Sequence, residues 1–123
     1  MSTAGNSIHL ELSFAASALA ALGHETRLAV FRLLVQAGEA GLQPGRMAEV
    51  LGLPASSLSF HLMHLQHAGL LASRREGRGL IYTTRYDVME ALMGYLLENC
   101  CRGEDGACAP PRRRKRQMAK TEA

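Results

Sequence analysis

The chain has 123 residues, enough for one domain that buries roughly two-thirds of the surface of its unfolded state. Three cysteines do not make the disulfide framework of a small secreted protein, and the longest apolar run near the N-terminus, residues 14–22, is too short to span a bilayer. The net charge of +3 is uneven, because residues 109–123 carry six basic side chains and one acidic one, whereas residues 1–108 carry eight basic and ten acidic ones. We therefore expect a cytoplasmic protein whose slightly acidic body binds nucleic acid only through local basic groups.

The N-terminal part of the chain predicts two helices after a short flexible segment. Residues 1–9 are small and polar, and residues 10–22 are rich in alanine with the pattern of a helix. A second helix is expected to begin near Glu25 and to end before Gly38. The side chains expected on its core-facing side are Leu28, Phe31, Leu34 and Val35.

Two further helices follow, joined by a short turn. Pro44 suits a first helical turn, where its missing N–H costs nothing, and Gly52 ends this helix. Its apolar side is expected to contain Met47, Val50 and Leu51. Pro54 begins the next helix, which closes at Gly69 and whose buried side is expected to contain Leu58, Leu62 and Leu65. Helices joined by so short a turn cross steeply, which predicts a helix-turn-helix.

A β-hairpin and a last helix complete the predicted domain. Residues 70–74 and 80–84 flank the turn formed by residues 76–79, in which Gly77 and Gly79 are expected to supply positive φ angles. Asp87 is the expected cap of the last helix. The apolar stripe expected along that helix contains Met89, Leu92, Met93, Leu96 and Leu97. This order of elements predicts a mainly α fold, the winged helix-turn-helix, over residues 10–108, with a disordered basic tail over residues 109–123.

Polar side chains are expected on the outward side of the fourth helix and at the hairpin. Hydroxyls and imidazoles near the start of such a helix suit phosphates and base edges, and arginines in a hairpin suit the DNA backbone or minor groove. The candidate DNA-binding residues are Gln43, Ser56, Ser57, Ser59, His61, His64, Arg74, Arg75 and Arg78. Each of them alone also fits an ordinary cap or a solvated surface, but their order along the chain favours double-stranded DNA as the partner.

Histidines recur every three residues at His61, His64 and His67. This spacing rotates the three imidazoles around a helix, and no carboxylate supports them as a second layer of a metal site. They are therefore interpreted as surface or DNA-facing residues.

Several segments resemble the ArsR/SmtB family of metal-responsive repressors: residues 22–28 (LGHETRL), 58–65 (LSFHLMHL), 68–71 (AGLL) and 74–78 (RREGR). The resemblance covers residues 15–97 and implies a homodimer that binds an inverted-repeat operator. It also implies an interface between first and last helices, with the candidate residues Leu19, Met89, Leu92, Met93 and Leu96. Two departures stand out: His24-Glu25 replaces the capping Asp followed by Pro of many relatives, and residues 41–47 lack the Cys-x-Cys motif of many arsenic sensors.

All three cysteines, Cys100, Cys101 and Cys108, lie within nine positions. Structural cysteines would be scattered through the core, so this cluster predicts a site for a soft ion. The chain resembles the branch of the family that places its arsenite thiols near the C-terminus. Three sulfurs satisfy trivalent arsenic or antimony, whereas four-coordinate zinc or cadmium would also need Glu104 or Asp105.

Two alternatives to metalloid sensing remain at this point: another soft metal (cadmium, zinc or lead), or thiol oxidation. Adjacent Cα atoms are about 3.8 Å apart, which disfavours a Cys100–Cys101 disulfide, but either residue can pair with Cys108. An enzyme is not expected, because there is no Cys-x-x-Cys pair and no phosphate-binding loop. The predicted function is repression of transcription, relieved by arsenite as effector and using no catalytic cofactor.

Overall fold

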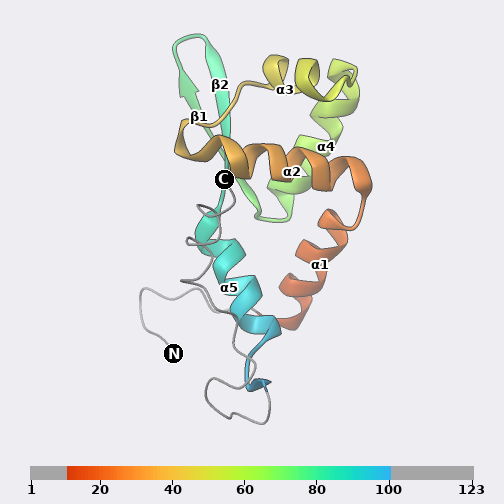
Figure 1. Cartoon of the computed structure of the whole chain (residues 1–123), viewed down its shortest axis with the longest axis vertical. Coiled ribbons are helices and arrows are strands. Elements are labelled where there is room, and N and C mark those ends of the chain that lie inside the picture. Colours follow the sequence, from red (N-terminus) through yellow and green to blue (C-terminus); the bar gives the residue numbers. More distant parts are fainter. Residues whose placement is uncertain (1–10, 101–123) are drawn as a thin grey trace, which may run out of the picture.

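The computed structural model describes residues 11–100. The predicted flexible N-terminus, the predicted basic tail, Cys101 and Cys108 lie outside the described residues. The elements, in the order shown in Figure 1, are α1 (Leu12–Leu22), α2 (Glu25–Ala37), the single 3-10 turn η1 (Gly38–Ala40), α3 (Pro44–Leu51), α4 (Ala55–His67), β1 (Leu71–Glu76), β2 (Gly79–Thr84) and α5 (Tyr86–Leu96). This order confirms the winged helix-turn-helix.

The core lies where α2, α4 and the base of the hairpin meet, and buried residues of α1 and α5 complete it. Leu58, Leu62 and Leu65 of α4 are each no more than 2% exposed, as their spacing predicts. On α2 the prediction was partly wrong, because Leu28 and Val35 are 43% and 39% exposed. The buried side chains of that helix are Val30, Phe31 and Leu34. Apolar residues occur on almost every side of α2, so packing and not periodicity selects the inner face.

Helix ends and turns follow local chemistry, with two corrections. Gly52 ends α3 in the left-handed conformation, as predicted, but Val50 of that helix is 50% exposed and does not join its buried side. α5 begins at Tyr86, so Asp87 is not its cap; the Asp87 carboxylate instead accepts hydrogen bonds of 3.2 and 2.9 Å from the Arg85 guanidinium. This pair holds the pKa of Asp87 below its ordinary value.

His24 caps the N-terminus of α2 with its side chain. Its Nδ1 atom accepts a 3.2 Å hydrogen bond from the Thr26 backbone N–H, and the α2 helix starts at Glu25. Close by, the Arg27 Nε–H donates to the Ala21 carbonyl oxygen at 2.7 Å. The start of α2 is therefore bound to the end of α1.

The wing is a two-stranded antiparallel hairpin with Leu71 opposite Thr84 and Glu76 opposite Gly79. Of the two turn glycines, Gly77 has a φ of 63°, but Gly79 has no positive φ and that part of the prediction was wrong. A Cβ at Gly79 would lie 2.5 Å from the Gln43 Nε2 atom, which is the end of a flexible, exposed side chain.

One face of the protomer, formed by α1 and α5, remains apolar and exposed. Both helices lie at the end of the molecule opposite the wing tip and α3 (Figure 1). The exposed side chains are Leu12, Leu19, Met93, Leu96 and Leu97, with exposed fractions from 38% to 72%. Three of them, Leu19, Met93 and Leu96, belong to the predicted dimer interface. The other two predicted interface residues lie differently: Leu92 is only 2% exposed and belongs to the protomer's own core, and Met89 is half-buried against that core.

No helix in the part of the chain that the structure describes has the length and apolarity needed to cross a membrane.

Candidate nucleic-acid interface

The outward side of α4 carries four of the nine predicted DNA-binding residues. Ser56, Ser59 and His64 are exposed, and Ser57 is half-buried. The sequence of this helix contains no Asp, Glu, Lys or Arg. α4 therefore presents hydrogen-bonding groups without any charge that would repel phosphates.

His61 does not lie on the outward side of α4, which corrects the prediction. It is half-buried, its ring centroid is 5.0 Å from that of His24, and its buried Nδ1 atom has no hydrogen-bond partner within residues 11–100. Burial lowers the pKa of His61, and His24, Arg27 and His64 lower it further because a second positive charge there is unfavourable. His61 thus joins α4 to the start of α2.

The lowered pKa of His61 predicts a dependence of stability on pH. In the unfolded chain the imidazole has its ordinary pKa of 6.5, so the unfolded state binds the proton first as the pH falls. The free energy of unfolding should therefore decrease as the pH is lowered through about 6.5, and this loss should stop once the pH is below the lowered pKa of the folded state. In denaturant unfolding between about pH 5 and pH 8, His61→Gln should flatten this decrease, while His67→Gln, at an exposed position of α4, should retain it.

The arginines of the wing have two different functions. The Arg74 guanidinium donates to the backbone oxygens of Glu39 and Ala40, both at 3.3 Å, and its Nε–H donates to the Glu76 carboxylate at 3.2 Å. Arg74 therefore attaches the wing to η1, while its exposed guanidinium stays a predicted DNA contact. Arg75 and Arg78 are exposed, and no ion pair within residues 11–100 engages them.

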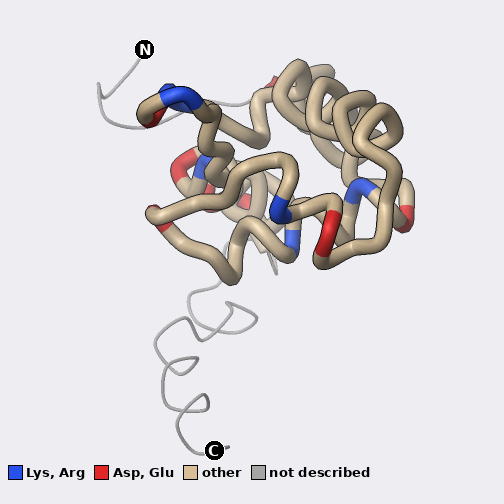
Figure 2. Tube along the Cα trace, turned by 90° about the horizontal axis from the view of Figure 1, so that it is seen from above, with Lys and Arg blue, Asp and Glu red and all other residues tan. Residues whose placement is uncertain are grey.

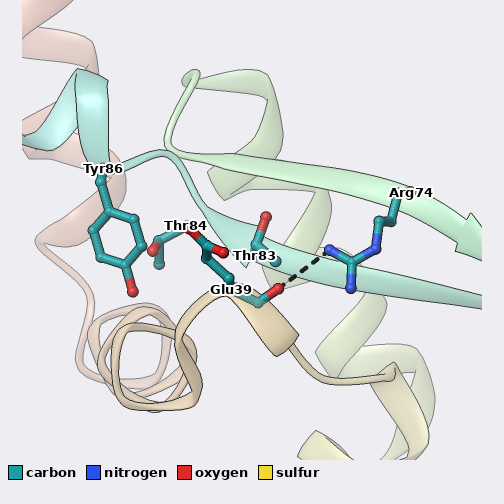
Figure 3. Close-up of a pocket in the computed structure, with 5 residues that line it drawn as sticks. All are labelled: Glu39, Arg74, Thr83, Thr84 and Tyr86. Atoms are coloured by element: carbon teal, nitrogen blue, oxygen red, sulfur yellow. Dashed lines mark hydrogen bonds between the residues drawn. The ribbon is translucent and has the colours of Figure 1, made fainter.

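A small open hollow of about 220 Å³ lies at the root of the wing, lined by Glu39, Arg74, Thr83, Thr84 and Tyr86. Figure 3 shows the guanidinium of Arg74 facing the backbone of Glu39 across it. Nearby, the Tyr86 hydroxyl donates a 3.0 Å hydrogen bond to the Val35 carbonyl oxygen of α2. The hollow is thus a junction at which α2, η1, the wing and α5 meet.

Positive charge on the described surface is local. Residues 11–100 contain seven arginines and no lysine, against eight acidic residues. In Figure 2 the basic positions are separated along the tube and interspersed with acidic ones. Within residues 11–100, side-chain attraction to phosphates must therefore come from particular arginines, of which Arg75 and Arg78 of the wing are the best placed.

Replacing Arg75 and Arg78 by glutamine should weaken binding to specific and scrambled duplexes by a similar factor. Phosphate contacts carry no base information, and each one lost should reduce the slope of log K against log salt by about 0.9. A dimer that uses both wings loses four such contacts, so the magnitude of its slope should fall by about 3 to 4. Fluorescence anisotropy over a salt series measures it, with the exposed Arg32→Gln of α2 as the matched control; an unchanged slope in the wing variant would exclude the wing from the DNA interface.

Gln43 precedes α3 and lies beside the wing. Its side chain is exposed as a whole, but its amide covers Gly79, and the neighbouring Leu42 exchanges two backbone hydrogen bonds with Tyr82 of β2. The structure thus places Gln43 between α3 and the wing, and its contact with DNA stays a prediction. Sequence reasoning missed Met63, which is 55% exposed on α4; a helical wheel drawn from the three buried leucines would have placed it outward.

The described thiol lies where α5 has already ended. The helix ends at Leu96, Asn99 has a φ of 59°, and the Cys100 N–H donates to the Leu97 carbonyl oxygen at 2.9 Å. Cys100 is half-buried. Within residues 11–100 no three His, Cys, Asp or Glu side chains are grouped closely enough to hold a metal ion.

Comparisons with known proteins agree with this geometry. Residues 22–74 match a family described as a helix-turn-helix domain. The HTH-type transcriptional regulator YgaV of Escherichia coli K12 is 30% identical over 87 residues, which cover 71% of this chain and 86% of YgaV.

Two solved structures have the same fold. HlyU from Vibrio cholerae N16961 is 29% identical, with a TM-score of 0.58 over 72% of this chain and 94% of HlyU. The homodimeric winged helix-turn-helix DNA-binding domain Mb0332 from Mycobacterium bovis, a possible ArsR-family transcriptional regulator, is 27% identical, with a TM-score of 0.59 over 76% of this chain and 87% of that one. The chain belongs to the ArsR family of winged helix-turn-helix transcriptional regulators, which bind DNA and are not enzymes.

Proposed function

We propose that the protein is a homodimeric repressor that binds an inverted-repeat operator and releases it when trivalent arsenic, or antimony, binds Cys100, Cys101 and Cys108. The observation that carries this proposal is the gathering of all three thiols of the chain directly after α5, one of the two helices with an exposed apolar face. No other part of the sequence contains a cysteine.

Homodimerisation is supported by the unpaired apolar face of α1 and α5. Leu19, Met93 and Leu96 are each more than 40% exposed, and a second copy would cover them by two-fold symmetry. The two recognition helices would then face successive half-sites on one side of the duplex. A symmetric dimer of this kind reads an inverted repeat.

A three-sulfur ligand set is supported by the end of α5. Successive side chains on a helix diverge by about 100°, so Cys100 and Cys101 on a continuing helix would not hold the same ion. The left-handed Asn99 shows that the chain has left the helix before the first thiol. Trivalent arsenic needs only three sulfurs, which is the number the sequence provides.

The path from the thiols to the DNA-binding elements is supported by the short connections of α5. At its other end, only Arg85 separates α5 from β2 of the wing, and the Arg85 N–H donates to the Leu70 carbonyl oxygen at 2.9 Å. The Tyr86 hydroxyl joins the same end to α2. Movement of α5 against its partner helix would therefore alter the wing and the distance between the two recognition helices.

The test is release of the full chain from a labelled operator duplex by arsenite, followed by anisotropy. Cys100→Ser and Cys108→Ser should each bind the duplex as the wild type does and no longer be released. Ser17→Ala of α1 serves as a control outside the thiols and should be released normally. Release of both cysteine variants at wild-type arsenite concentrations would refute the assigned site, and parallel titrations with antimonite, cadmium, zinc, lead and peroxide would identify the effector if it is not arsenic.

A further inference from the structure

The side of α4 farthest from the core carries two large apolar side chains, Phe60 and Met63. They are 50% and 55% exposed, whereas a helical side chain facing the protein interior, such as Leu62, is 2% exposed. With 100° between successive residues, Phe60 and Met63 point away from the three buried leucines of α4. At a spacing of three residues their Cβ atoms lie about 5–6 Å apart, so the two side chains form one apolar strip.

The surroundings of this strip are polar but uncharged. Ser56, Ser59 and His64 are exposed beside it, and residues 55–67 contain no charged Asp, Glu, Lys or Arg side chain. The Phe60 ring is held by an edge contact with the His64 ring, with centroids 4.7 Å apart. An ordered apolar strip edged by hydroxyls and imidazoles is unsuited to phosphates but suited to the edges of base pairs.

We propose that Phe60 and Met63 determine operator specificity by packing on the C5-methyl groups of thymines in the major groove. The methyl of thymine is the apolar group that base pairs present there, and Phe is among the side chains that contact it. This inference rests on the proposed docking of α4 in operator DNA and adds to it the class of base that is read. The arginines of the wing supply attraction to the backbone, and α4 supplies discrimination.

The experiment replaces thymine by uracil, which removes the methyl and keeps every hydrogen-bonding group. A duplex is first selected by the full chain from a random-sequence pool, and each thymine is then changed to uracil in both half-sites. We expect one or two positions per half-site at which affinity falls about fourfold for each methyl removed. Phe60→Ala or Met63→Ala should abolish the loss of affinity at the thymine that the replaced side chain contacts. At that position the variant should bind the thymine and uracil duplexes equally.

The control is Val50→Ala on α3, an apolar side chain with 50% exposure, which should keep the wild-type response to uracil. Binding of the selected duplex that is insensitive to uracil at every position would overturn this inference and leave the proposed repressor intact. If uracil lowers the affinity of the wild type and of both α4 variants by the same factor, the inference is also overturned, because the methyl must then contact some other residue. Failure to select any duplex would overturn the proposed function together with this inference.

Discussion

Replacing Met93 and Leu96 by glutamate is expected to convert the dimer into monomers and to lower operator affinity at least about 100-fold. The two side chains are 52% and 54% exposed on α5, and two-fold symmetry would bring four new carboxylates into one apolar interface. A monomer engages one half-site and loses the gain from linking two binding events, which is typically 10²–10⁴. Sedimentation equilibrium measures the oligomeric state, and anisotropy with the operator duplex measures the affinity.

The matched control is Leu28→Glu on α2, where the replaced leucine is 43% exposed but lies outside the α1 and α5 face. This variant should remain dimeric. Met93→Glu/Leu96→Glu protein that stays dimeric at micromolar concentration would show that the protomers meet through another surface. Unchanged operator affinity in a proven monomer would contradict reading of an inverted repeat.

Gly41→Ala is expected to be the most destabilising single methyl addition at any glycine of residues 11–100, at about 2–4 kcal/mol. The added Cβ would overlap the Tyr82 carbonyl oxygen and would lie 2.6 Å from Ile81 Cγ2 and 2.8 Å from Thr83 Cγ2. The φ of Gly41 is 66°, which side chains rarely adopt. Because Leu42 and Tyr82 exchange hydrogen bonds here, the substitution would push the segment before α3 away from β2.

Gly38→Ala separates the two causes of the lost stability, which are strain in the backbone and overlap of the new Cβ with β2. Gly38 has a φ of 71° and a similar extended ψ, but a Cβ there would meet nothing within 4 Å. We expect Gly38→Ala to cost clearly less than Gly41→Ala in guanidinium unfolding at one fixed protein concentration. Equal losses in the two variants would mean that backbone strain alone, and not contact with the wing, requires Gly41.

The order of elements was predictable because its signals are local. Pro44, Gly52 and Gly38 mark the ends of helices through their own backbone chemistry. The spacing of Leu58, Leu62 and Leu65 puts three leucines on one side of α4, opposite Phe60 and Met63. α2 lacks this clarity, since Leu28 and Val35 are apolar and yet exposed. Its inner face depends on how α2 lies against α4, which involves residues far apart in sequence.

The contacts of two candidate site residues escaped prediction for the same reason. The turn of Arg74 toward the η1 carbonyl oxygens spans more than 30 residues, and the contact of His61 with His24 spans 37. Neither contact leaves a mark in the local pattern, so both residues read as members of a DNA surface. Leu92 was predicted at the dimer interface but lies in the core. The apolar stripe of α5 is wide enough to contact both the protomer's own core and a second protomer, and only the fold divides it into a buried side and an exposed side.

The thiols after α5 and the DNA-facing elements are proposed to be energetically coupled, and a complete linkage cycle measures this coupling. Operator affinity is measured with and without saturating arsenite, and arsenite affinity with and without saturating operator, on the full chain. The factor by which arsenite lowers operator affinity must equal the factor by which the operator lowers arsenite affinity, counted over all sites of one dimer. We predict that this common factor is at least about tenfold. Arsenite that binds the thiols and leaves operator affinity unchanged would show that the two sites are not coupled.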